Sequence, residues 1–309
     1  MKKKSKSQKF NPVAVIIVLA AVAWYLLRPA DDATTATPAP SETTSSTTSS
    51  TTSSTKSTTS TTSKSSTTSA TSTGFSVENI EIPAKIVGRQ EQIITHTGYT
   101  ASYNSDWKIP NWVAYELTKE EAEGVVPRGN SFVPDPEVPR NKSATTGDYT
   151  NSGWDRGHMA PAADMRWSEK AMKESFYLSN VCPQNRNLNA GIWKDLEEQV
   201  RGLARQKGNV YVVSGPLVSK KPATIGNNNV AVPDAFFKVL LQNNNGEWSA
   251  VAFMFANKSG RQPLSTYAMS VEDMQIVAEM DFFPALPDSI EERIESHVDF
   301  TKWSLFAKK

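Results

Sequence analysis

Residues 152–164 read SGWDRGHMAPAAD and place an aspartate, an arginine, a glycine and a histidine side by side. The histidine, His158, is one of only three in the chain. It has two interpretations: an imidazole packed in a loop, or the general base of a site that cleaves phosphodiester bonds. Such hydrolysis needs a base for the attacking water, a cation on the phosphate oxygens and stabilisation of the leaving oxygen.

The Asp-Arg-Gly-His stretch contains the residue types for this chemistry. The pKa of an imidazole lies near neutrality, so His158 could take a proton from water. In a strand, Arg156 would share a face with His158, where its guanidinium could bind a phosphate through two parallel hydrogen bonds. Gly157 between them would allow a close backbone approach. Four polar residues alone do not distinguish such a site from a packed loop.

A second stretch, FYLSNVCPQNRNLNAGIWKDLEEQ (residues 176–199), strengthens the hypothesis of a site. The pattern predicts a helix with Asn189 just inside its start and Glu197 roughly 80° further around the axis. An asparagine oxygen suits a hard cation such as Mg²⁺, and a nearby glutamate could hold the waters of that ion. Alternatively, Asn189 is a helix cap and Glu197 a solvated side chain. The spacing alone does not decide between the two.

With these motifs the sequence resembles the DNA/RNA non-specific endonucleases, ββα-metal enzymes that include mitochondrial endonuclease G. The resemblance spans residues 95–300, and its most specific part is Asp-Arg-Gly-His followed downstream by Asn-x(7)-Glu. Other matching segments come in the family's order: IPNWVAYELT, FYLSNVCPQN, VYVVSGPL, VPDAFFKVLL and DFFPALPD. The resemblance implies the ββα-metal nuclease fold.

The resemblance also implies a role for each matching residue. The general base falls on His158, the direct Mg²⁺ ligand on Asn189 and the supporting carboxylate on Glu197. The remaining site residues are Asn180, Arg156 and, in a looser alignment, Arg128. The implied cofactor is Mg²⁺, with Mn²⁺ able to replace it.

The implied reaction is hydrolysis of DNA and RNA, in which His158 deprotonates a water that attacks phosphorus in line. Mg²⁺ would stabilise the leaving 3′ oxygen, so the products carry 5′ phosphates. Contacts to phosphate and sugar would make cleavage insensitive to sequence. Two alternatives stay open: a stalked extracytoplasmic module that binds nucleic acid without cleaving it, and a phosphodiesterase for small nucleotides. The complete set of site residues favours the endonuclease.

The N-terminal residues predict a membrane segment. Residues 1–11 form a basic head, and residues 12–28 hold an apolar run that spans roughly 24 Å as a helix, against ~30 Å of hydrocarbon. The run is a signal peptide or an uncleaved anchor; interfacial Trp24 and Tyr25 and the lack of a small-x-small cleavage site favour the anchor. We therefore expect a single-pass protein of the cell membrane with its globular part extracytoplasmic, in the periplasm or at the cell surface. Cleavage of the segment would make it secreted.

Residues 29–74 are mostly Ser and Thr, a composition that predicts a disordered linker, acting either as a stalk or only as slack. Residues 75–309 have the composition of one globular domain, the nuclease domain of the resemblance. The single cysteine, Cys182, excludes an intramolecular disulfide, and its neighbours Val181 and Pro183 offer no base for a catalytic thiol. A homodimer is compatible with the sequence.

The charge of residues 75–309 is slightly acidic, with 25 Lys and Arg against 29 Asp and Glu. This balance argues against a globally basic nucleic-acid binder. However, residues 272–299 alone hold nine acidic side chains and one basic, Arg293. We expect a polyanion to meet the remaining, net positive part of the surface.

The pattern of apolar residues predicts an α+β fold with a central, largely antiparallel sheet flanked by helices. Expected strands are residues 109–118, 209–218, 235–243 and 248–257, and expected helices are residues 189–207 and 289–300. The remaining candidate residues are expected to be structural. His96 is expected to be surface-exposed, His297 to face out of or cap the last helix, and Lys238 to lie at a sheet edge. Trp154 and Trp167 are expected in the core or a lid.

Overall fold

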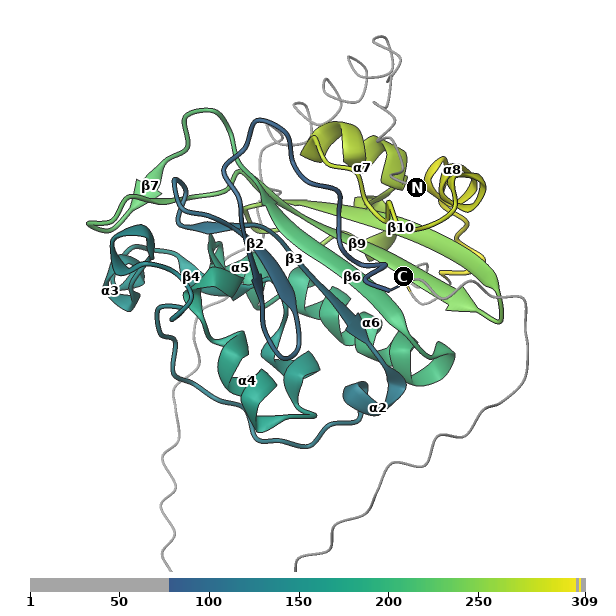
Figure 1. The fold of residues 1–309 in the computed structure, drawn as a ribbon, viewed down its shortest axis with the longest axis horizontal. Helices are drawn as coiled ribbons and strands as arrows, with labels where there is room; N and C mark the ends of the chain where they lie inside the picture. Colours follow the sequence, from purple (N-terminus) through teal and green to yellow (C-terminus); the bar gives the residue numbers. More distant parts are fainter. Residues whose placement is uncertain (1–77, 304–305, 307–309) are drawn as a thin grey trace, which may run out of the picture. The chain divides into compact units, whose positions relative to one another are not determined.

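The computed structural model describes residues 78–303 and Phe306. Its centre is a seven-stranded sheet in the order β1, β2, β3, β6, β9, β10, β11 (Figure 1). Each neighbouring pair of strands is antiparallel, which confirms the predicted α+β class. The strands are β1 (Gln92–Thr95), β2 (Thr100–Asn104), β3 (Ile109–Leu117), β6 (Val210–Leu217), β9 (Ala235–Asn244), β10 (Glu247–Ala256) and β11 (Ala268–Met269).

Both faces of this sheet are buried. Along β3, Val113 and Tyr115 belong to one hydrophobic cluster, whereas Trp112 and Ala114 belong to a second. Alternate side chains of a strand point to opposite faces, so the two clusters lie on the two sides of the sheet. This double burial explains why the strand segments are almost continuously apolar.

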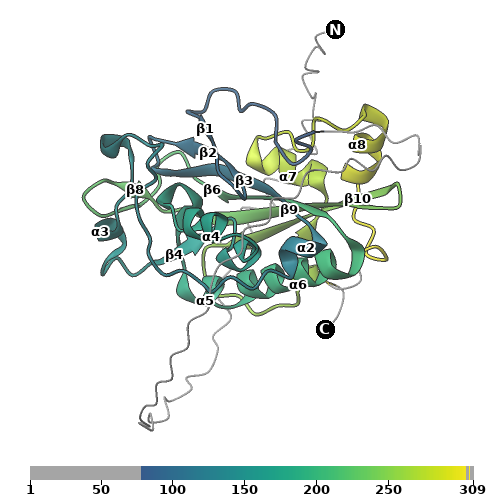
Figure 2. The same cartoon turned by 60° about the horizontal axis from the view of Figure 1, so that its bottom comes forward.

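Helices cover the two faces unequally. The long helix α6 contributes Leu196 and Val200 to the first cluster, and α7 and α8 contribute Met274 and Ile294 to the second. Figures 1 and 2 show α7 and α8 on one side of the sheet and α2, α4 and α6 on the other. The helices are α2 (Lys119–Ala122), α3 (Thr146–Tyr149), α4 (Glu169–Ser175), α5 (Arg186–Asn189), α6 (Ile192–Lys207), α7 (Val271–Ala278) and α8 (Asp288–Glu295).

The prediction of one helix over residues 189–207 is wrong at its start. Asn189 is the last residue of α5, and α6 begins only at Ile192. Gly191 separates them with φ −107° and ψ −120°, outside the helical region. Asn189 and Glu197 therefore lie on two helices, and their positions are not related by the geometry of one helical wheel. The predicted stripe of α6 is confirmed, because Trp193, Leu196 and Val200 are buried.

A short hairpin precedes these two helices. It pairs β4 (Asp155–His158) with β5 (Val181–Gln184), so the Asp-Arg-Gly-His stretch is a strand, the condition under which Arg156 and His158 share a face. The two strands are close at Gly157, where a Cβ would lie 2.2 Å from Oε1 of Gln184. Hairpin, α5 and α6 together form a ββα unit packed against the sheet.

The C-terminal helix is shorter than predicted. α8 ends at Glu295, and the exposed His297 follows it, where its Nδ1 lies 3.2 Å from Oγ of Ser296. At the other end of the chain, the predicted basic head, membrane segment and Ser/Thr linker all lie outside the described residues. Within residues 78–303 and Phe306, no helix is both long and apolar enough to cross a bilayer.

Candidate active site

A cleft of about 500 Å³ lies beside the β4–β5 hairpin, a size typical of ligand-binding sites. It is lined by Arg128, Phe132, Asp155, Arg156, His158, Pro161, Ala162, Ala163, Asn189, Lys194, Glu197 and Arg201. The structure thus brings together five of the six residues expected in the site, from the hairpin, α5, α6 and the loop before them. The sixth, Asn180, does not line the cleft.

His158 lies in an aromatic surround. Its side chain packs against Phe132 and Phe176, with ring centroids 5.1 Å and 5.0 Å away. Its Nε2 atom is buried and has no hydrogen-bond partner among the described residues. Burial, and secondarily the charge of Arg128, lower the pKa of this imidazole to about 3. His158 is therefore neutral near pH 7, with one ring nitrogen that has no partner from the protein.

Two arginines supply positive charge around this imidazole. Arg156 lies between Phe132 and Tyr149, 5.6 Å from each ring centroid, and one of its amino groups donates to the carbonyl of Thr146 at 3.0 Å. Its Nε is buried without a partner. Arg128 lies 5.5 Å from the ring of Phe176. The stacked rings restrict where these guanidinium groups can point, and Arg156 keeps an N–H that can bind an anion.

The amide of Asn189 is oriented by Asp155. Nδ2 of Asn189 donates to Oδ2 of Asp155 at 3.3 Å, and Arg186 donates to Oδ1 of the same carboxylate at 3.2 Å. A carboxylate only accepts hydrogen bonds, so the amide nitrogen must face it and the amide oxygen points the other way. An oriented amide oxygen with carboxylates in the same cleft is a donor set that fits a hard divalent cation. The sequence argument assigned no role to Asp155.

Glu197 lies next to a buried network of charges. Burial raises the pKa of its carboxyl, while the charge of Lys238 opposes that rise. Behind it, Arg201 and Asp164 form an ion pair of 2.8 Å, and Asp164 also accepts from Tyr115. Arg201 could have been recognised from the sequence, because it follows Glu197 by one helical turn and shares its face.

The expectation that Lys238 lies at a sheet edge is wrong. β9, which carries it, lies between β6 and β10, and its side chain is 0% exposed. Nζ donates to Oγ of Ser214 at 2.6 Å and lies 4.5 Å from the ring of Trp193. Because burial disfavours the charged amine, the pKa of Lys238 is lowered. Lys238 is thus a buried cation behind the floor of the cleft.

Asn180 supports the chain just after His158 from outside the cleft. Its amide oxygen accepts from the backbone nitrogen of Ala160 at 2.8 Å. Its amide nitrogen donates to the carbonyls of Ala160 and Ser175, each at 2.8 Å. Asn180 is buried, and these hydrogen bonds hold the turn that follows β4.

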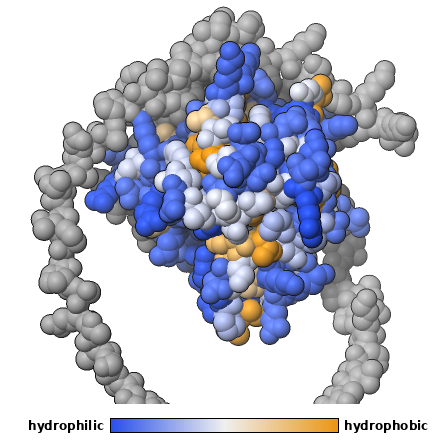
Figure 3. All heavy atoms as spheres, turned by 90° about the vertical axis from the view of Figure 1, so that its left-hand side faces the viewer, coloured by the Kyte–Doolittle hydropathy of each residue, from blue (hydrophilic) through white to orange (hydrophobic). Residues whose placement is uncertain are grey.

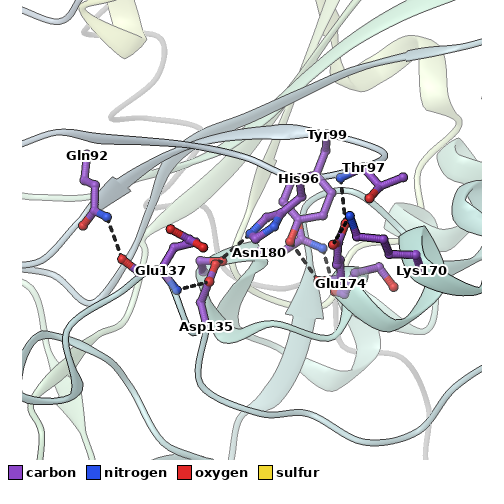
Figure 4. Close-up of polar contacts among 11 residues, drawn as sticks. Gln92, His96, Thr97, Tyr99, Asp135, Glu137, Lys170, Glu174 and Asn180 are labelled. Atoms are coloured by element: carbon purple, nitrogen blue, oxygen red, sulfur yellow. Dashed lines mark hydrogen bonds and ion pairs between the residues drawn. The ribbon is translucent and has the colours of Figure 1, made fainter.

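The expectation that His96 is surface-exposed is also wrong. Its side chain is 5% exposed, and its Nε2 lies 2.8 Å from Oδ2 of Asp135. Figure 4 shows His96 beside Asp135, and Ser179, the residue before Asn180, donates to the same carboxylate oxygen. His297, by contrast, is exposed as expected. The positions of the two tryptophans are confirmed, since both are partly buried against the main core: Trp154 and Trp167.

The chain is similar to proteins of known function. The sequence profile of the DNA/RNA non-specific endonucleases matches residues 76–289. The chain therefore belongs to this family, as its motifs predicted.

Named relatives are nucleases. The mitochondrial nuclease EXOG of Mus musculus is 37% identical over 224 residues, which cover 67% of this chain and 61% of the mouse protein. Mitochondrial endonuclease G of Homo sapiens is 36% identical over 207 residues, which cover 62% of this chain and 70% of the human protein. A solved chain in the EndoG/EndoGI complex, whose structure describes EndoG inhibition, has a TM-score of 0.60 at 32% identity and covers 64% of this chain and 87% of its own.

Proposed function

We propose that this protein is a metal-dependent, sugar-non-specific endonuclease that hydrolyses DNA and RNA and leaves 5′ phosphates. The observation that carries the proposal is the unpartnered Nε2 of His158 in a cleft shared with the amide of Asn189 and two arginines. A buried polar atom without a partner is costly to the fold, and this one lies beside a cleft in which a ligand can hydrogen-bond to it. Membership of an endonuclease family supports the same conclusion.

His158 acts as the general base. Its lowered pKa keeps the imidazole neutral, the form that can accept a proton from the attacking water. A bound phosphodiester brings negative charge next to Arg128, and this charge opposes the effect of the arginine on the imidazole. The pKa of His158 therefore rises on substrate binding toward the range in which proton transfer is efficient.

The other cleft residues hold the substrate and a divalent ion. Arg128 and Arg156 bind the non-bridging oxygens and stabilise the charge that builds up in the transition state. The amide oxygen of Asn189 would hold Mg²⁺, or Mn²⁺ in its place, with Glu197 accepting hydrogen bonds from the waters of the ion. When bound, the ion supplies Lewis-acid stabilisation of the scissile phosphate and the leaving 3′ oxygen.

The charges of the cleft fit a polyanion whatever its sequence. Four cationic side chains line it against two carboxylates, Asp155 and Glu197. Contacts of this kind grip phosphate and sugar, and carry no direct information on the bases. The competing function, a module that binds nucleic acid without cleaving it, would give no reason for an unpartnered imidazole beside the arginines.

A plasmid-nicking assay tests the proposal. We expect nicking with Mg²⁺ and none with chelator, and products that polynucleotide kinase labels only after phosphatase treatment. Asn189→Ala should lose activity that added Mg²⁺ partly restores, whereas Asn187→Ala, an exposed asparagine of the same helix, should behave as wild type. Binding without nicking under every metal condition would favour the non-cleaving module, and unchanged metal dependence of Asn189→Ala would remove the ligand assignment.

The same proposal includes the location of the protein. The basic residues 1–11 followed by the apolar residues 12–28 support a single-pass anchor with the nuclease domain extracytoplasmic. Fractionation tests it, followed by protease treatment of intact cells for a surface location and of cells with a permeabilised outer envelope for a periplasmic one. The nuclease domain should cosediment with membranes and be digested from outside, and its recovery in the medium would instead indicate cleavage of the segment.

A further inference from the structure

A second hollow, of about 540 Å³, lies between α3 and the turn of the β7–β8 hairpin (Thr224–Ile225 and Val230–Ala231). Figures 1 and 2 show α3 and this hairpin together at one end of the domain, beside β4. We call the hollow the amide groove. Its lining residues include Thr150, Asn151, Ser152, Gly226, Asn227 and Asn228.

Asp148 fixes the two walls of the amide groove to each other. Its carboxylate accepts from the backbone and side chain of Asn228 at 2.8–3.1 Å, and from the backbone and hydroxyl of Thr145 at 2.7 Å and 2.9 Å. Gly226, at φ +66°, lies so close that a Cβ would be 2.3 Å from Oδ1 of Asp148. The groove is therefore preformed, because the buried Asp148 carboxylate accepts hydrogen bonds from both of its walls.

Helix α3 lines the amide groove and also contacts Arg156, a residue of the cleft. Arg156 lines the cleft and donates to the carbonyl of Thr146, while Thr145 and Gly147 on either side of Thr146 line the groove. Tyr149 of the same helix packs against the Arg156 guanidinium. If Arg156 holds a phosphate of a nucleic-acid strand, the adjacent nucleoside of that strand lies on the side of the amide groove.

The chemistry of the two cavities differs. Four cationic side chains line the cleft, whereas the lining of the amide groove consists mainly of amides and hydroxyls, and its one carboxylate is already hydrogen-bonded. Figure 3 shows that hydrophilic residues predominate at this end of the domain. Neutral groups that both donate and accept hydrogen bonds match sugar hydroxyls and base edges better than they match phosphates.

We propose that the amide groove binds the sugar and base of a nucleotide adjacent to the scissile phosphate. This inference rests on the endonuclease function proposed above and extends it with a nucleoside subsite. The cleft holds the phosphate, and the groove holds the uncharged part of the same strand. Single-stranded nucleic acid, whose sugars and bases are accessible, is the form that can fill both cavities.

Asn227 allows a test, because it is exposed in the groove and outside the catalytic residues. Asn227→Asp places a negative charge where the strand would pass. Asn244→Asp adds the same charge at an exposed position at the far end of β9, where β9 turns into β10. The full chain and both variants are assayed with Mg²⁺ on a single-stranded DNA oligonucleotide and on bis(4-nitrophenyl) phosphate, which has no nucleoside. Thermal unfolding checks that both variants are folded.

We expect Asn227→Asp to raise the KM for the oligonucleotide about tenfold, a typical effect of losing one well-placed polar contact. Asn227→Ala should raise it less, and Asn244→Asp should leave it unchanged. Hydrolysis of bis(4-nitrophenyl) phosphate should be the same in all three. Equal KM for Asn227→Asp and Asn244→Asp, or a slower reaction of Asn227→Asp with the small substrate, would overturn the nucleoside subsite. Failure of the unmodified chain on both substrates would instead overturn the endonuclease function.

Discussion

Two buried histidines of this protein have opposite surroundings. His96 lies beside Asp135 (Figure 4), so its Nε2 has a hydrogen-bond partner, and the Asp135 carboxylate also accepts from Ser179 and from the backbone nitrogen of Glu137. His158 is buried among aromatic rings, and its Nε2 has no partner. Buried polar groups that are satisfied stabilise a fold, and those left unsatisfied cost stability. The comparison therefore supports a structural role for His96 and the proposed base role for His158.

The largest expected effect is on catalysis by His158. His158→Ala should lower kcat on plasmid DNA by about 10²–10⁴, the usual contribution of a general base. Circular dichroism should show a folded protein, and the exposed His297→Ala should keep wild-type activity. Hydrolysis by His158→Ala at the wild-type rate would remove the base assignment and the contrast with His96.

The matching change at His96 should act on stability. His96→Phe removes a hydrogen bond to the buried Asp135 carboxylate, at a cost of about 1.5–3 kcal/mol for a bond to a charged group. The free energy of unfolding in urea should fall by this amount, while kcat per folded molecule stays close to that of wild type. A variant with unchanged stability and reduced kcat would reverse the roles given to the two histidines.

The pH dependence of stability should reveal the burial of His158. Its pKa is about 3 in the folded protein and 6.5 ordinarily, so below pH 6.5 the unfolded chain binds a proton that the folded state excludes. This contribution destabilises the fold as pH falls from 6.5 toward 3, by about 1.4 kcal/mol per pH unit. His158→Gln should show a correspondingly smaller loss between pH 6.5 and 4 in urea titrations. An identical slope would mean that the imidazole is protonated in the folded state.

The smallest expected effect is on the salt dependence of nucleic-acid binding. It is tested at two lysines, one on the His158 side and one on the His96 side. Lys194 lines the cleft and pairs with Glu198 at 3.4 Å, whereas Lys170 pairs with Glu174 at 3.7 Å on the His96 side. Both lysines are exposed and pair with a glutamate one helical turn away, although Glu174 itself is buried. Lys194→Ala should reduce the slope of log binding constant against log salt concentration by about 1, and Lys170→Ala should not. Equal slopes would place the nucleic acid elsewhere on the surface.

Local pattern was sufficient to predict much of the fold. The strands and the apolar stripe of α6 follow from periodicities of two and of 3.6 residues, which act within one segment. The shared face of Arg156 and His158 follows in the same way, because both lie in a four-residue strand. Motifs added the members of the cleft that come from distant segments, such as Asn189.

Contacts between distant segments were not predictable from pattern. His96 is paired with Asp135, which lies 39 positions away in the sequence. Lys238 is buried because its strand, β9, lies between β6 and β10. Lysine is common on edge strands and rarely buried in the centre of a sheet. The pattern around Lys238 therefore favoured an edge strand, whereas β9 is a central one. The break at Gly191 was missed because one glycine in a helical pattern is often tolerated.

Because Gly157 lies so close to Gln184, the residues at positions 157 and 184 cannot be varied independently. Since a methyl group there would lie 2.2 Å from Oε1 and 2.6 Å from Cβ of Gln184, an alanine at 157 can be accommodated only with glycine at position 184. A library that varies the Asp-Arg-Gly-His strand alone should therefore return glycine at its third position, whatever activity is selected. Other residues become possible between Arg156 and His158 only when the side chain at position 184 is changed at the same time.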